Sequence, residues 1–92
     1  MMAASPTFAA TLRSAADALA AAGVESARLD AEVLLAAAAG TDRTRLVIDA
    51  QRPVPTAVLD RFATWLRRRV EREPLQYIVG TREFWSLDFI VT

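Results

Sequence analysis

The side chains of this chain that could do chemistry are carboxylates and arginines, because the sequence contains no histidine and no cysteine. Ser/His/Asp and Cys/His catalytic sets each need one of the missing residue types, and so do the usual zinc sites. No glycine-rich turn follows a predicted strand, as the phosphate and cofactor sites of nucleotide-binding folds require. The sequence therefore predicts no catalytic, cofactor-binding or metal-binding residue in this chain.

Asp30 is the carboxylate with the most unusual position in the helical pattern. At 100° per residue it falls inside the apolar arc of its helix, between Val33 and Leu34. It is either a first-turn acid that complements the helix dipole and reaches water, or a buried acid that needs a basic partner. We expect a structural ion pair, since no second acid or base completes a catalytic site. The candidate partners are Arg68, Arg69 and Arg82.

Every basic residue is an arginine, and the eleven arginines balance eleven acidic residues. A net charge of zero argues against direct binding of nucleic acid, which usually needs a basic surface. The run Arg67-Arg68-Arg69 fans around most of a helical turn and so forms no flat basic face. We expect a solvated helix end that complements the helix dipole, with phosphate binding or docking of an acidic protein as the alternatives.

Apolar spacing and helix-end residues predict the elements that position these side chains. Helices are expected over residues 6–22, 27–39, 42–49, 59–70 and 74–79, and a β-hairpin over residues 82–91. The predicted N-caps are Ser5, Ser26 and Thr41, with stops at Gly23 and Gly40. The fold class is therefore all-α: a small helical bundle of four to five helices over residues 1–80, then a short C-terminal β-hairpin or linker over residues 81–92.

The core must depend on a few large side chains, because much of the apolar content is alanine. The helix over residues 59–70 has the clearest apolar stripe. We expect it to be the central stabilising helix of the bundle, with Ala63 among its inward-facing residues. The predicted core consists of Phe8, Leu12, Leu19, Leu29, Val33, Leu34, Leu46, Ile48, Leu59, Phe62, Trp65, Leu66 and Val70.

Two sequence blocks near the C-terminus resemble a known family. They are Glu-Pro-Leu-Gln-Tyr-Ile-Val-Gly at residues 73–80 and Arg-Glu-Phe-Trp-Ser-Leu at residues 82–87. Together they resemble the junction between the helical and catalytic domains of the release factor glutamine methyltransferases, the HemK/PrmC family. Residues 26–35, which end before Gly40, extend the likeness over nearly the whole chain.

The resemblance implies an N-terminal domain that presents a peptide chain release factor to a catalytic domain. That absent domain would use S-adenosylmethionine to methylate the glutamine of the factor's Gly-Gly-Gln tripeptide. The resemblance also implies that the parent protein is an enzyme, that this chain ends where the catalytic domain would begin, and that the chain alone binds no cofactor and does not catalyse.

Four aromatic residues near the C-terminus could form a surface for that absent domain or for another partner. They either pack the hairpin onto the bundle or face the catalytic domain. These residues are Tyr77, Phe84, Trp85 and Phe89.

The alternative function is a free-standing helical interaction module, either an adaptor or a degenerate helix-turn-helix. The N-terminus lacks the features of a secretory signal, and the longest apolar run is too short for a membrane span. We therefore expect a soluble cytoplasmic protein with no membrane partner.

Overall fold

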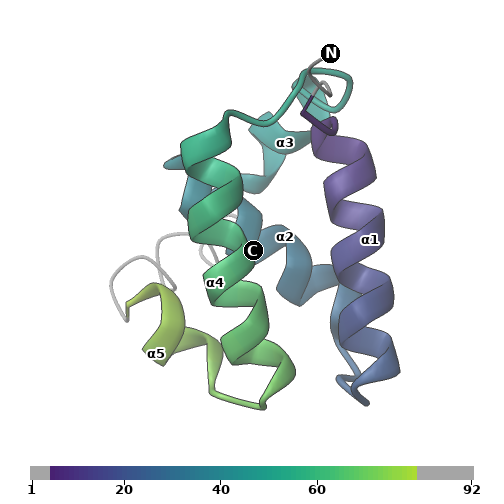
Figure 1. Cartoon of the computed structure of the whole chain (residues 1–92), viewed down its shortest axis with the longest axis vertical. Helices are drawn as coiled ribbons and strands as arrows, with labels where there is room; N and C mark the ends of the chain where they lie inside the picture. Colours follow the sequence, from purple (N-terminus) through teal and green to yellow (C-terminus); the bar gives the residue numbers. More distant parts are fainter. Residues whose placement is uncertain (1–4, 81–92) are drawn as a thin grey trace.

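The computed structural model describes residues 5–80, which form a bundle of five helices (Figure 1). They are α1 (Phe8–Ala21), α2 (Ala27–Ala39), α3 (Arg43–Ile48), α4 (Thr56–Val70) and α5 (Leu75–Val79). The α1 and α4 helices lie side by side, and α2 passes behind them and contacts the other four helices. The all-α prediction is confirmed for these residues, whereas the predicted hairpin over 82–91 lies outside the described part of the chain.

The helix at the centre of the bundle is α2. The expectation that the fourth helix, α4, would be the central stabilising helix is wrong. Nine residues of α2 are buried, whereas α4 has one buried residue, Phe62. A clear apolar stripe marks a helix with a single buried face, and α4 has such a stripe. The blurred apolar pattern of α2 belongs to a helix that is covered on most sides, and its alanines let the neighbouring helices approach closely.

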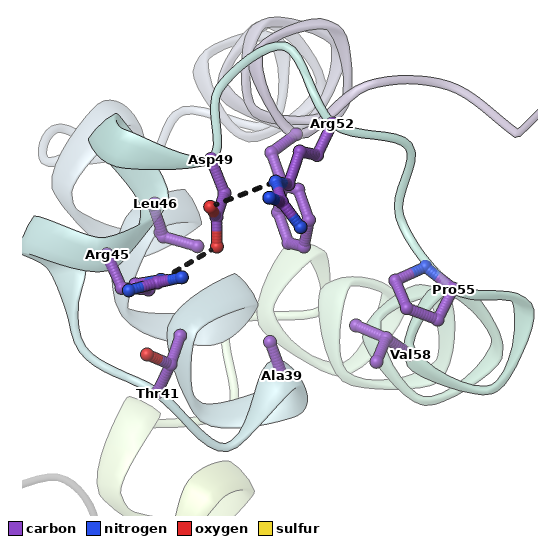
Figure 2. Close-up of a pocket in the computed structure, with 9 residues that line it drawn as sticks. Ala39, Thr41, Arg45, Leu46, Asp49, Arg52, Pro55 and Val58 are labelled. Carbon is purple, nitrogen blue, oxygen red and sulfur yellow. Dashed lines mark hydrogen bonds and ion pairs between the residues drawn. The ribbon is translucent and has the colours of Figure 1, made fainter.

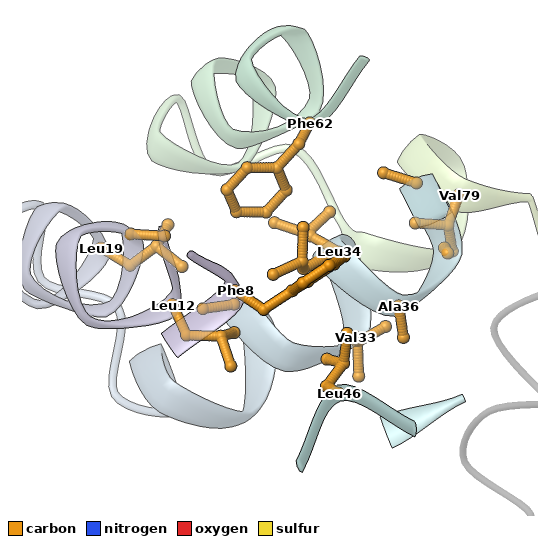
Figure 3. Close-up of a cluster of buried hydrophobic side chains, with 14 of the residues drawn as sticks. Phe8, Leu12, Leu19, Val33, Leu34, Ala36, Leu46, Phe62 and Val79 are labelled. Carbon is orange, nitrogen blue, oxygen red and sulfur yellow. The ribbon is translucent and has the colours of Figure 1, made fainter. Parts of the chain in front are cut away.

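Large side chains from the other helices converge on α2 (Figure 3). Phe8, Leu12 and Leu19 come from α1, and Phe62 points from α4 toward Leu34. Of the predicted core residues of α4, Leu59, Trp65, Leu66 and Val70 are only partly buried against this cluster.

Three predicted inward residues lie outside the core. Leu29 is 42% exposed and Ile48 is 65% exposed, and Ala63 is also exposed. In the run Leu46-Val47-Ile48, a helix can turn only part of three consecutive side chains inward, and Leu46 is the buried one. Val54, in the loop before α4, is fully buried although no helical pattern pointed to it.

The start of α1 differs from the prediction. The Thr7 hydroxyl, not that of Ser5, caps α1 by accepting the Ala10 N–H at 3.1 Å. Pro6 lies outside the helix, and its carbonyl accepts the Val54 N–H at 2.9 Å, next to an antiparallel bridge between Thr7 and Pro53. This pairing delays the helix by two residues.

The other helix ends are local features. Asp42, not Thr41, caps α3 by accepting the Arg45 N–H at 2.8 Å. Ser26 stands at the N-cap position of α2, as predicted, although its hydroxyl makes no bond to the helix backbone. Gly40 ends α2 with a left-handed φ of 71°, where glycine avoids the strain of a side chain.

Candidate functional site

Asp30 lies in the first turn of α2 with a side chain only 3% exposed. Its two carboxylate oxygens have different partners. Arg69 Nε donates to Oδ2 at 2.8 Å from the end of α4, and Ser26 Oγ donates to Oδ1 at 2.9 Å. Asp30 is therefore a buried acid and not a solvated one, and Arg69 is its partner among the candidate arginines that the structure describes.

Arg68 engages α5 and the turn before it. Its guanidinium forms an ion pair with Glu73 in which Nε donates to Oε1 at 2.9 Å, and Nη2 donates to the Tyr77 carbonyl at 3.3 Å. The Arg68 bond is the main reason that the pKa of the Glu73 carboxyl is lowered, and the same bond raises the pKa of Arg68. Arg82, the third candidate partner of Asp30, lies outside the described residues.

The turn between α4 and α5 is fixed by the backbone as well as by these arginines. Arg72 has a left-handed φ of 73°, unusual for a residue with a side chain. The Glu73 N–H bonds to the Arg68 carbonyl at 3.1 Å, and the Arg72 N–H bonds to the Arg69 carbonyl at 2.8 Å, as in a Schellman motif. Arg69 Nη1 adds a bond to the Glu73 carbonyl at 3.1 Å.

We call Asp30, Arg68, Arg69 and Glu73 the junction cluster. Its two acids each accept hydrogen bonds from an arginine, so their carboxylate oxygens are engaged within the fold and no second acid or base completes a catalytic set with them. The cluster binds α2, α4 and α5 to one another. The arginine run is thus not the solvated helix end that the sequence suggested, because two of its three members are bonded within the fold.

Of the four aromatic residues near the C-terminus, Tyr77 lies within the part of the chain that the structure describes. It is 66% exposed on α5, whereas Ile78 and Val79 of the same helix are buried. The α5 helix therefore packs through Ile78 and Val79 and presents Tyr77 outward. Phe84, Trp85 and Phe89 lie outside the described residues.

A pocket that the sequence analysis did not identify lies beside α3 (Figure 2). Its volume is about 350 Å³, and its apolar lining comes from α1, α2, α3 and α4, with Leu46 on the α3 side. Arg45 Nε donates to Asp49 Oδ2 at 3.0 Å, and Arg52 Nε lies 3.5 Å from Asp49 Oδ1. We call these three residues the Asp49 rim; the spacing of Arg45 and Asp49 by four was its one signal in the sequence.

A second, smaller pocket of about 150 Å³ lies on the other side of α3. Leu46 and Val47 line it from α3. Arg28 Nε and Arg43 Nε donate to the two carboxylate oxygens of Glu32, each at 2.9 Å. We call Arg28, Arg43 and Glu32 the Glu32 rim. Arg28 is four residues before Glu32 on the same helix, and Arg43 joins the pair from eleven residues after Glu32.

Residues 5–80 contain no group of three or more acidic side chains placed to hold a metal ion. Within the same residues, none of the helices combines the length and apolar character needed to cross a bilayer.

Comparison with known proteins identifies related sequences. The sequence model of the PrmC N-terminal domain matches residues 10–80. A release factor glutamine methyltransferase of Geobacter sulfurreducens is 50% identical over 70 residues, which are 76% of this chain and 25% of that protein. One from Bradyrhizobium diazoefficiens is 46% identical over 83 residues, 90% of this chain and 26% of that protein.

A third relative, the release factor glutamine methyltransferase of Pseudomonas aeruginosa, is 50% identical over 66 residues, 72% of this chain and 24% of that protein. The chain thus spans about a quarter of the length of each of these relatives. No solved structure matches it.

Proposed function

This chain belongs to the family of PrmC N-terminal domains, and from that membership we propose that it is the release-factor-recognition domain of a protein-glutamine methyltransferase. The parent enzyme would use S-adenosylmethionine to methylate the Gly-Gly-Gln glutamine of class I peptide chain release factors in the cytoplasm. Residues 1–80 would form the recognition bundle, and residues 81–92 would lead into the catalytic domain. The chain alone would bind the release factor and not catalyse.

The observation that carries this proposal is the extent of the family match. Residues 10–80 include nearly all of α1 and the whole of the other four helices, and the match ends directly after α5. The matched region is therefore a folded unit with its own core, and the relatives that share it are named for one activity. Of the alternatives, a helix-turn-helix that binds DNA has less support, because Arg68 and Arg69 are bonded within the fold and not free to contact phosphates.

The experiment is a domain exchange in the Geobacter sulfurreducens relative, which is 50% identical over the shared region. Residues 10–80 of this chain replace the matching segment, and methylation of that organism's release factor is measured. We expect kcat/KM within about tenfold of the parent enzyme, whereas deletion of the segment should lower it further. A folded chimaera that binds S-adenosylmethionine but is no better than the deletion variant would contradict the proposal.

The chain alone provides a second test. Calorimetric titration of the 92-residue chain with S-adenosylmethionine should show no saturable binding. The physical reason is that the sequence offers no glycine-rich turn to hold the cofactor. Saturable micromolar binding would show that the chain holds a cofactor site of its own.

A further inference from the structure

The outward side of α3 is apolar although the helix has only six residues. Val47 is 77% exposed and Ile48 is 65% exposed, and Thr44, one turn earlier, is exposed beside them. We call these three residues the α3 ridge. Single exposed aliphatic residues are ordinary on protein surfaces, but two adjacent ones beside open pockets form a continuous apolar surface.

Pockets lie on both sides of this ridge and share Leu46 as part of their lining. At 100° per residue, Arg45 and Asp49 fall on the side of the larger pocket, while Arg43 and Val47 fall on the side of the smaller one. This placement agrees with the residues that line each pocket. A partner that covers the α3 ridge could therefore insert a side chain on each side of it.

The two pockets have the same arrangement of charge. In the Asp49 rim, two arginines share one carboxylate, and in the Glu32 rim the arrangement repeats. Each rim therefore carries one positive charge in excess. The hydrogen bonds within the rims use the Nε–H of Arg28, Arg43 and Arg45, and a guanidinium has four further N–H donors that suit a carboxylate.

The α3 ridge and the α5 helix lie in different parts of the bundle. In Figure 1, α3 lies toward the upper end of the longest axis and α5 toward the lower end, and that axis is 39 Å long. The α5 helix, which carries the exposed Tyr77, thus lies toward the opposite end of the bundle from the α3 ridge.

We propose that the α3 ridge and its two arginine-bearing rims form the surface to which the release factor docks. The docking segment would place apolar side chains over Val47 and Ile48, with an acidic side chain toward each rim. Complementary charge would guide the encounter, and the apolar contact would supply most of the affinity. This inference rests on the proposed function, because it names the surface through which that function acts.

The test measures binding of the 92-residue chain to a full-length class I release factor at fixed ionic strength. Val47→Ser/Ile48→Ser removes the apolar contact, and Arg45→Gln/Arg52→Gln removes positive charge from one rim. We expect each double variant to raise Kd at least about fivefold, which corresponds to a loss of about 1 kcal/mol of binding free energy. Both pairs of side chains are more than half exposed, so the far-UV circular dichroism of the variants should match the wild type.

A matched control removes the same charge elsewhere. Arg13→Gln/Arg67→Gln alters two exposed arginines on α1 and α4, away from the α3 ridge. We expect its Kd to stay within about twofold of the wild type, because it changes net charge and not the contact. Equal weakening by the control and by the Arg45/Arg52 variant would show a general charge effect and overturn the docking surface.

The remaining outcomes separate this inference from the proposed function. If the wild-type chain binds the release factor and the ridge variants bind equally well, the docking surface is wrong and the proposed function stands. If the wild-type chain does not bind, both fail. Sedimentation of the chain alone is the last check: a dimer that Val47→Ser/Ile48→Ser abolishes would assign the ridge to self-association instead.

Discussion

Replacing Arg69 by methionine tests whether the junction cluster holds the bundle together. Methionine keeps most of the aliphatic stem and removes the guanidinium, so Asp30 is left with the Ser26 hydroxyl as its partner. The Asp30 side chain is 3% exposed and that of Arg69 is 18% exposed, so neither group is well placed to regain water. The variant therefore measures the free-energy cost of a buried carboxylate without its basic partner, together with the loss of the Arg69 bond to the Glu73 carbonyl.

The expected magnitude follows from the geometry of the pair. Charge centres about 4 Å apart attract by about 4 kcal/mol at the effective dielectric constant of about 20 typical of proteins. Breaking a buried pair on one side costs about 3–5 kcal/mol in general. We expect Arg69→Met to lower the free energy of unfolding by that amount, a large part of the total of roughly 5–14 kcal/mol for a domain of this size.

Urea unfolding followed by far-UV circular dichroism provides the measurement. Arg28→Met is the matched control, because Arg28 is 61% exposed and Glu32 keeps Arg43 as a second partner. The control should cost less than about 1 kcal/mol. Asp30→Asn together with Arg69→Met should be less destabilising than the sum of the two single changes, since the double variant leaves no buried charge unpaired. A loss below about 1 kcal/mol for Arg69→Met would refute this reasoning.

Three further predictions concern packing, a buried hydroxyl and acid stability. Leu34→Ala should cost about 2–5 kcal/mol in urea unfolding because Leu34 is fully buried, and Leu66→Ala should cost less because Leu66 is half-buried; equal costs would contradict this account of the core. Thr11→Val should raise the free energy of unfolding by about 1 kcal/mol, because the Thr11 hydroxyl is buried without a hydrogen-bond partner among the described residues; destabilisation would show that the hydroxyl is satisfied. The lowered pKa of Glu73 supplies stability above its unfolded-state pKa of about 4.3, and that stability is lost as the pH falls through the folded-state value. Glu73→Gln should therefore reduce the loss of stability over that acid range, and an unchanged acid profile would contradict a role for the bond to Arg68.

The order and approximate bounds of the helices follow from the sequence, because caps, prolines and glycine stops act within a few residues. Gly40 ends α2 as its position predicts, and the two prolines at residues 53 and 55 separate α3 from α4. The start of α1 could not be predicted in this way. Its delay to Phe8 depends on Pro6 and Thr7 pairing with residues 53 and 54, a contact between segments far apart in the chain.

The sequence also determined that Asp30 lies within an apolar arc and which arginines could reach it. Arg68 and Arg69 are neighbours at one helix end, about 100° apart around the axis. Which of them meets Asp30 depends on how α4 lies against α2, and local sequence carries no record of that orientation. The same limit applies to the pocket beside α3, because its lining extends from Phe8 to Val58 and exists only once the helices have packed. Local chemistry thus determined the elements and the candidate residues, whereas the packing of α1, α3, α4 and α5 around α2 decided which side chains became partners and which stayed exposed.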